Sequence, residues 1–185
     1  DLVAWQLAVA SGKPLPKAQN ELSIQGHAIE VRIYAENPEN DFLPAAGSLW
    51  RLKQPAANAN IRIDTGVIQG DEVGVFYDPM IAKLIVWGET RTIAIQRVQQ
   101  ALGEYKIAGV TTNVDFLRRL IAVPAFREAI LKTDFIEQHH RELFGHEDHT
   151  ITLAQAGLYL TLAPVSQGAT LEMATRKPQI DSSSP

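Results

Sequence analysis

The chain has 185 residues, of which 45% are hydrophobic and 21% charged, a mixture typical of a protein that buries a core. Its formal net charge of -4 disfavours sequence-independent nucleic-acid binding. The absence of cysteine excludes disulfides, thiol catalysis and thiolate metal ligands. No apolar run reaches the ~18–20 residues that a membrane span needs. We therefore expect neither a nucleic-acid partner nor a membrane partner.

The chain opens directly in a helical pattern. Val3, Leu7 and Ala10 share one face over residues 1–11, Asp1 is placed to cap the helix, and Gly12 is placed to end it. A sequence that begins inside a helix is typical of a piece of a longer protein, and we expect this chain to be one.

Short strands are predicted next. Residues 27–34 alternate, with Ile29, Val31 and Ile33 on one face and Glu30 and Arg32 on the other, which indicates a strand buried on one side. Further strands are expected at residues 48–52, 61–64, 73–77 and 80–87.

Helices dominate the following segment. Thr90 or Thr92 can cap an amphipathic helix that runs to Tyr105. A short strand at residues 107–110 precedes a second helix capped by Thr112 or Asn113. Shorter helices are expected from Pro124 and from Thr133. Strands followed by helices predict an α+β fold, a small antiparallel, barrel-like sheet flanked by α-helices, without βαβ alternation.

Several ordered motifs resemble one family. They are GHAIEVRIYAENP at residues 26–38, FLPAAG at 42–47, YDPMIAKL at 77–84, and Gly109 followed by Thr112 and Asn113. Together they are similar to the C-terminal domain of biotin carboxylases. The resemblance implies that residues 1–25 end an ATP-grasp region and that residues 26–144 form the biotin carboxylase C-terminal domain. Residues 145–185 would then begin a domain that links to carboxyltransferase and end in a partly disordered tail.

Within this family, TDFIEQHH at residues 133–140 resembles the biotin-containing (alpha) subunits of 3-methylcrotonyl-CoA carboxylases. Geranyl-CoA carboxylase is a close alternative, and propionyl-CoA and acetyl-CoA carboxylases are further ones. A non-catalytic interaction or assembly module also stays open. The resemblance implies a ligase that is inactive as this piece alone.

The resemblance assigns catalysis and biotin binding to the arginine of the E-x-R-I motif, which is Arg32 here. A fixed cation beside the ureido oxygen of biotin stabilises the negative charge that develops there during carboxylation. Arginine suits this task because it stays charged and donates from a rigid fork. Without the resemblance, Arg32 would be read as a surface residue paired with Glu30.

Two carboxylates are candidates to support Arg32. Glu30 shares its face and could hold it in place, and Asp78 in the YDPM motif could orient it or could serve the turn before Pro79. No metal site is expected, because His139 and His140 are adjacent and point about 100° apart on a helix.

The resemblance also implies partners and cofactors. Biotin would be carried on a domain outside this chain, and ATP and Mg would bind an ATP-grasp domain that also lies outside it. The carboxyltransferase (beta) subunit is an expected partner, and Arg62 marks a possible homodimer contact. The expected location is cytoplasmic in a bacterium and the mitochondrial matrix in a eukaryote.

Overall fold

The computed structural model describes residues 1–74, 76–144, 153–155 and 158. The chain divides into two units, Asp1–Gly145 and His146–Pro185, and the fold described below is that of the first. The linking domain and tail predicted at residues 145–185 lie, apart from residues 153–155 and 158, outside the described residues. That prediction therefore stays a prediction.

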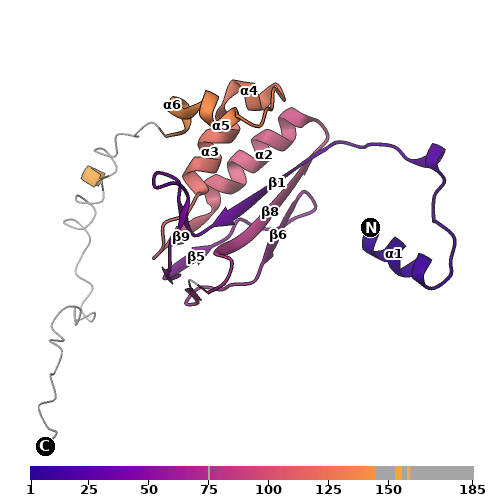
Figure 1. The fold of residues 1–185 in the computed structure, drawn as a ribbon, viewed down its shortest axis with the longest axis horizontal. Helices are drawn as coiled ribbons and strands as arrows, with labels where there is room; N and C mark the ends of the chain where they lie inside the picture. Colours follow the sequence, from indigo (N-terminus) through magenta and orange to yellow (C-terminus); the bar gives the residue numbers. More distant parts are fainter. Residues whose placement is uncertain (75, 145–152, 156–157, 159–185) are drawn as a thin grey trace, which may run out of the picture. The chain divides into compact units, whose positions relative to one another are not determined.

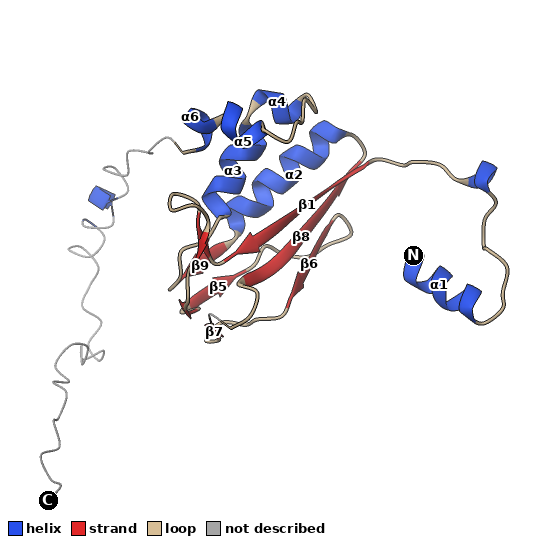
Figure 2. Ribbon diagram, in the orientation of Figure 1, coloured by secondary structure: helices blue, strands red, loops and turns tan. Residues whose placement is uncertain are grey.

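A three-stranded antiparallel sheet organises the domain (Figure 2). Its strands are β1 (His27–Tyr34), β8 (Met80–Gly88) and β6 (Ile61–Thr65), in the order β1-β8-β6. β-branched residues are frequent in all three strands, and such residues fit a pleated, half-buried surface. In β1 burial alternates, and Ile29, Val31 and Ile33 are buried as the sequence predicted.

Helix α2 (Arg91–Glu104) covers the buried face of this sheet (Figure 1). Thr90 caps it, its Oγ1 accepting from the N–H of Ile93 at 3.3 Å. Gly88 allows the close approach of strand and helix, because a Cβ there would lie 2.5 Å from the nitrogen of Ala94. The buried residues of this helix are Ala94, Ile95, Val98, Ala101 and Leu102.

Four shorter helices follow, namely α3 (Val114–Ala122), α4 (Pro124–Arg127), α5 (Phe135–Gln138) and α6 (His140–Leu143). They form a second apolar cluster beside the main core, built on Phe116, Val123, Phe135 and Leu143. The rings of Phe42 and Phe116 meet edge to face within it, with centroids 5.0 Å apart.

The remaining strands form two-stranded ladders. β2 (Glu36–Asn37) pairs with β3 (Leu43–Pro44), β4 (Gly47–Ser48) with β7 (Glu72–Val73), and β5 (Arg51–Lys53) with β9 (Lys106–Ala108). Two predicted strands were too long. The strand expected at residues 48–52 is divided, because the N–H of Trp50 turns back to the carbonyl of Ser48 at 3.0 Å. Of the described residues in the strand expected at 73–77, only Val73 is paired, as part of β7, and Phe76 and Tyr77 are exposed.

The α+β class is confirmed, with antiparallel pairing throughout the described strands. No closed barrel is formed across residues 1–74 and 76–144, because the strands there form separate small sheets. At the N-terminus, α1 (Leu2–Ala10) is capped by the Asp1 carboxylate as predicted, and η1 (Gln19–Glu21) follows. Neither element contains a buried residue. In the described part of the chain, no helix has the length and apolar character of a membrane span.

Candidate functional site on the outward face of the sheet

Two rows of side chains cross the face of the sheet that α2 does not cover. In one row Arg32 of β1 lies opposite Lys83 of β8, which lies opposite Asp64 of β6. In the next row Glu30 lies opposite Ile85, which lies opposite Arg62. The alternation of strand side chains brings these residues to one surface. We call Glu30, Arg32, Arg62, Asp64 and Lys83 the charged face.

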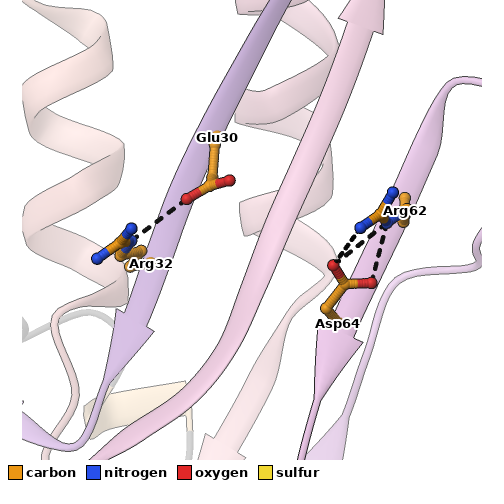
Figure 3. Close-up of polar contacts among 4 residues, drawn as sticks. All are labelled: Glu30, Arg32, Arg62 and Asp64. Carbon is orange, nitrogen blue, oxygen red and sulfur yellow. Dashed lines mark hydrogen bonds and ion pairs between the residues drawn. The ribbon is translucent and has the colours of Figure 1, made fainter. Parts of the chain in front are cut away.

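Arg32 and Glu30 form an ion pair along β1 (Figure 3). The Nε of Arg32 lies 3.3 Å from Oε1 of Glu30, and the two side chains are 57% and 44% exposed. The bond to Glu30, followed by an interaction with the side chain of Tyr34, raises the pKa of Arg32 above its ordinary value. The guanidinium is therefore a permanent and accessible cation.

A second ion pair lies on β6, also shown in Figure 3. Arg62 donates from Nη2 to Oδ2 of Asp64 at 2.7 Å and from Nε to Oδ1 at 3.0 Å, a forked contact. This contact lowers the pKa of Asp64 and raises that of Arg62. The side chain of Arg62 is 75% exposed, so a partner molecule can still reach it.

Asn113 holds β1 beneath Arg32. Its Oδ1 accepts from the N–H of Tyr34 at 3.0 Å, and its Nδ2 donates to the carbonyl of Arg32 at 3.1 Å and to Oε1 of Glu36 at 2.9 Å. Asn113 was predicted as a possible cap, and it does occupy the N-cap position of α3. However, its side chain makes no capping bond. The tertiary contact with β1 uses the whole amide instead.

Asp78 takes part in the turn before β8. Its Oδ1 accepts from the N–H of Met80 at 3.0 Å, a local bond typical of aspartate in turns. Among the described residues, no hydrogen bond or ion pair joins Asp78 to Arg32. The structure thus brings Glu30 to Arg32 and places Asp78 in the alternative role that the sequence left open.

The charged face has the donor chemistry for an anionic oxygen. The pair with Glu30 engages only the Nε–H of Arg32, and a guanidinium has five N–H donors. Within the described ranges, no group of three or more histidine and acidic side chains could hold a metal, and His139 contacts Glu142 instead.

Sequence reasoning assigned no role to Lys83 and only a local role to Asn113. Both stand inside the motifs at residues 77–84 and 109–113, so the signal was present. The periodicity of β8 showed that Lys83 alternates with buried neighbours, but only the strand register places it between Arg32 and Asp64.

The family model of the biotin carboxylase C-terminal domain matches residues 30–138. The chain belongs to this family. The biotin carboxylase resemblance of the sequence motifs is thereby confirmed, and the matched range includes the charged face, Asn113 and Asp78.

Curated biotin carboxylase relatives are longer than this chain. It is 52% identical over 143 residues to the methylcrotonoyl-CoA carboxylase subunit alpha of Mus musculus, covering 77% of this chain and 20% of the relative. It is 47% identical over 139 residues to the biotin carboxylase of Halalkalibacterium halodurans, covering 75% of this chain and 30% of that protein. The chain thus spans about a fifth of the mouse subunit.

Solved biotin carboxylases share the fold. The biotin carboxylase subunit of a pyruvate carboxylase superposes with a TM-score of 0.74 at 35% identity, covering 80% of this chain and 32% of that one. The biotin carboxylase domain dimer of the Hydrogenobacter thermophilus 2-oxoglutarate carboxylase has the same TM-score at 34% identity, with coverage of 80% and 32%.

Proposed function

We propose that this chain is the C-terminal part of the biotin carboxylase component of a biotin-dependent acyl-CoA carboxylase, with Arg32 as its catalytic residue. The observation that carries the proposal is the placement of Arg32. The motif arginine of a family member stands accessible on the outward face of the sheet, held by Glu30 along its own strand.

Biotin, when bound, supplies the ureido nitrogen that receives the carboxyl group. In the proposed catalytic role, Arg32 donates N–H groups to the anionic oxygen of biotin, and Glu30 restricts the guanidinium to one side of β1. An exposed cation stabilises such an oxygen weakly, because water screens it. The same cation acts strongly once water is excluded. The charged face therefore needs a covering domain before it can act.

This requirement explains why we expect no carboxylation by the chain alone. The ATP-grasp domain, with its ATP and Mg sites, and the biotin carrier domain would come from the remainder of the full-length subunit. The chain covers only 20% of the mouse relative, which leaves room for both. The carboxyltransferase (beta) subunit would be the further partner.

The proposed acyl-CoA substrate is 3-methylcrotonyl-CoA. Support comes from the 52% identity to the mouse methylcrotonoyl-CoA carboxylase subunit and from 47% identity to that of Dictyostelium discoideum. Geranyl-, propionyl- and acetyl-CoA remain the alternatives, because the carboxyltransferase partner selects the acyl group. Those relatives are mitochondrial by name, which favours the mitochondrial matrix if the source is a eukaryote.

Assembly is a second role that one observation favours. The side chain of Arg62 is 75% exposed, and a solved relative is a biotin carboxylase domain dimer. We expect Arg62→Glu to replace a positive charge with a negative one on the edge strand β6 and to weaken self-association of the full-length subunit. Sedimentation velocity of the wild type and the variant at matched concentrations measures this effect, and an unchanged distribution of species would remove Arg62 from the interface.

The catalytic proposal is tested in the full-length subunit by biotin-dependent ATP cleavage. Arg32→Ala should lower kcat by about 100-fold or more, the scale of losing one donor to a developing oxyanion, with the KM for ATP unchanged. Arg51→Ala, which removes an exposed arginine of β5, is the matched control and should retain activity. Wild-type turnover in Arg32→Ala would reject the role of Arg32.

A further inference from the structure

At Arg32 and Tyr34, the free edge of β1 forms hydrogen bonds with a side chain and not with a further strand. β1 pairs only with β8 in the three-stranded sheet, with Val31 opposite Leu84 and Ile33 opposite Ala82. Edge strands present unpaired N–H and C=O groups. At the positions of Arg32 and Tyr34 these groups are bonded to Asn113.

The side-chain amide of Asn113 acts here as a peptide group would. Its oxygen accepts from the N–H of Tyr34, and its nitrogen donates to the carbonyl of Arg32 and to Glu36. The backbone N–H of Asn113 donates to the carbonyl of Tyr34 at 3.2 Å. The residue is only 4% exposed, and a buried amide with both N–H donors engaged is held rigidly.

The Arg32 guanidinium has no comparable support of its own. Its described partners, Glu30 and Tyr34, both lie on β1, so neither fixes it relative to another element. The position of the guanidinium within the domain therefore depends on the β1 backbone. That backbone is held by β8 on one edge and by Asn113 on the other.

We propose that Asn113 is a positioning residue for Arg32, acting through the backbone carbonyl of Arg32 and the N–H of Tyr34. This inference rests on the proposed function, because it gives Asn113 a part in the reaction assigned to Arg32. The competing explanation is that Asn113 only attaches α3 to β1 and contributes stability alone.

The test uses the full-length subunit and two substitutions that separate these explanations. Asn113→Asp keeps the oxygen that accepts from Tyr34 but turns the donor to Arg32 and Glu36 into an acceptor. Adding Glu36→Gln supplies an amide donor to the new carboxylate, which repairs that contact and leaves the carbonyl of Arg32 without its donor. Asn58→Asp is the matched control, because Asn58 is an exposed turn residue whose oxygen accepts from the N–H of Asn60.

We expect Asn113→Asp to lower kcat for biotin-dependent ATP cleavage about tenfold, since small misplacements of a catalytic group are costly. The KM for ATP should stay within about twofold, because that site lies on another domain. The double variant should regain the melting temperature of the wild type but not its kcat. In an Arg32→Ala background, Asn113→Asp should lower kcat no further, because the two residues act in one unit.

Recovery of kcat together with melting temperature in the double variant would overturn the positioning role. An unchanged kcat in Asn113→Asp, or the failure of both variants to fold, would overturn it too. The Arg32→Ala enzyme is measured in parallel and identifies which proposal fails. If Arg32→Ala is inactive while the Asn113 variants are fully active, only this inference falls; if Arg32→Ala is active, the proposed function falls.

Discussion

The two faces of the three-stranded sheet come from the same strands but differ in almost every physical respect. The inner face places Ile33, Leu84 and Val86 in a core where each is fully buried. The outer face carries Arg32 and Arg62, whose side chains are more than half exposed. Neighbouring residues of one strand thus occupy opposite environments.

The inner face accounts for the stability of the fold, and the outer face carries the residues of the candidate site. Burial of aliphatic side chains is the dominant favourable term in folding, and it is concentrated on the inner face. Exposed ion pairs contribute little to stability, so the fold does not explain why charges cross the outer face in register. The proposed function accounts for them through a ligand or a partner surface.

The largest expected effect breaks the inner face. Leu84→Ala should lower the free energy of unfolding of this chain by about 2–5 kcal/mol, the range for emptying a buried leucine site. Ile85→Ala, one residue further along β8 and half-buried, should cost clearly less. Urea unfolding followed by circular dichroism measures both, and equal losses would show that the two faces are not energetically distinct.

The next effect concerns the two arginines of the outer face. Arg32→Lys in the full-length subunit should reduce biotin-dependent turnover about tenfold, because lysine keeps the charge but not the rigid fork. Arg62→Lys, the same change in the ion pair on the other edge, should leave turnover within about twofold of wild type. Comparable losses in steady-state assays of the two variants would contradict an active centre at Arg32.

A third effect concerns Glu36, half-buried beside Asn113. Burial raises the pKa of this carboxyl, although the bond from Asn113 opposes the shift. The folded state therefore holds the proton more tightly than the unfolded state. The stability that this provides is present below the ordinary pKa of about 4.5 and is lost as the pH rises through the folded value. Glu36→Gln should gain stability relative to wild type over that rise, measured by urea unfolding at a series of pH values.

The smallest effect concerns Asp64. Arg62 lowers the pKa of this carboxylate, so its contribution is present above the ordinary value of about 3.8 and is lost as the pH falls through the folded value. Asp64→Asn should therefore be less stable than the wild type at neutral pH, and the difference in free energy of unfolding should shrink as the pH falls into the acid range. Because the pair is exposed, about 1 M salt should remove the difference at neutral pH; persistence in salt would indicate a contact shielded from solvent.

Local pattern was sufficient wherever the chain obeys a simple period. Alternation predicted β1 and its buried residues, and apolar spacing after a cap at Thr90 or Thr92 predicted α2, where the structure places Thr90 at the cap. The local pattern failed at residues 48–52, where the chain turns at Leu49 within an apparently extended segment. Turns inside short apolar runs depend on what packs around them, and a period cannot show that.

The sequence by itself determined the family and the α+β class, because motifs and periodicity are properties of neighbours along the chain; it also made Arg32 the candidate that the proposed function tests. Only the tertiary structure decided that Glu30 is bonded to Arg32 while Asp78 accepts from the N–H of Met80, and that Lys83 stands between Arg32 and Asp64. It also decided that the Asn113 amide bonds to β1 instead of capping α3. These contacts join residues distant in sequence, and they follow from strand register and helix docking, which the whole packed core sets at once.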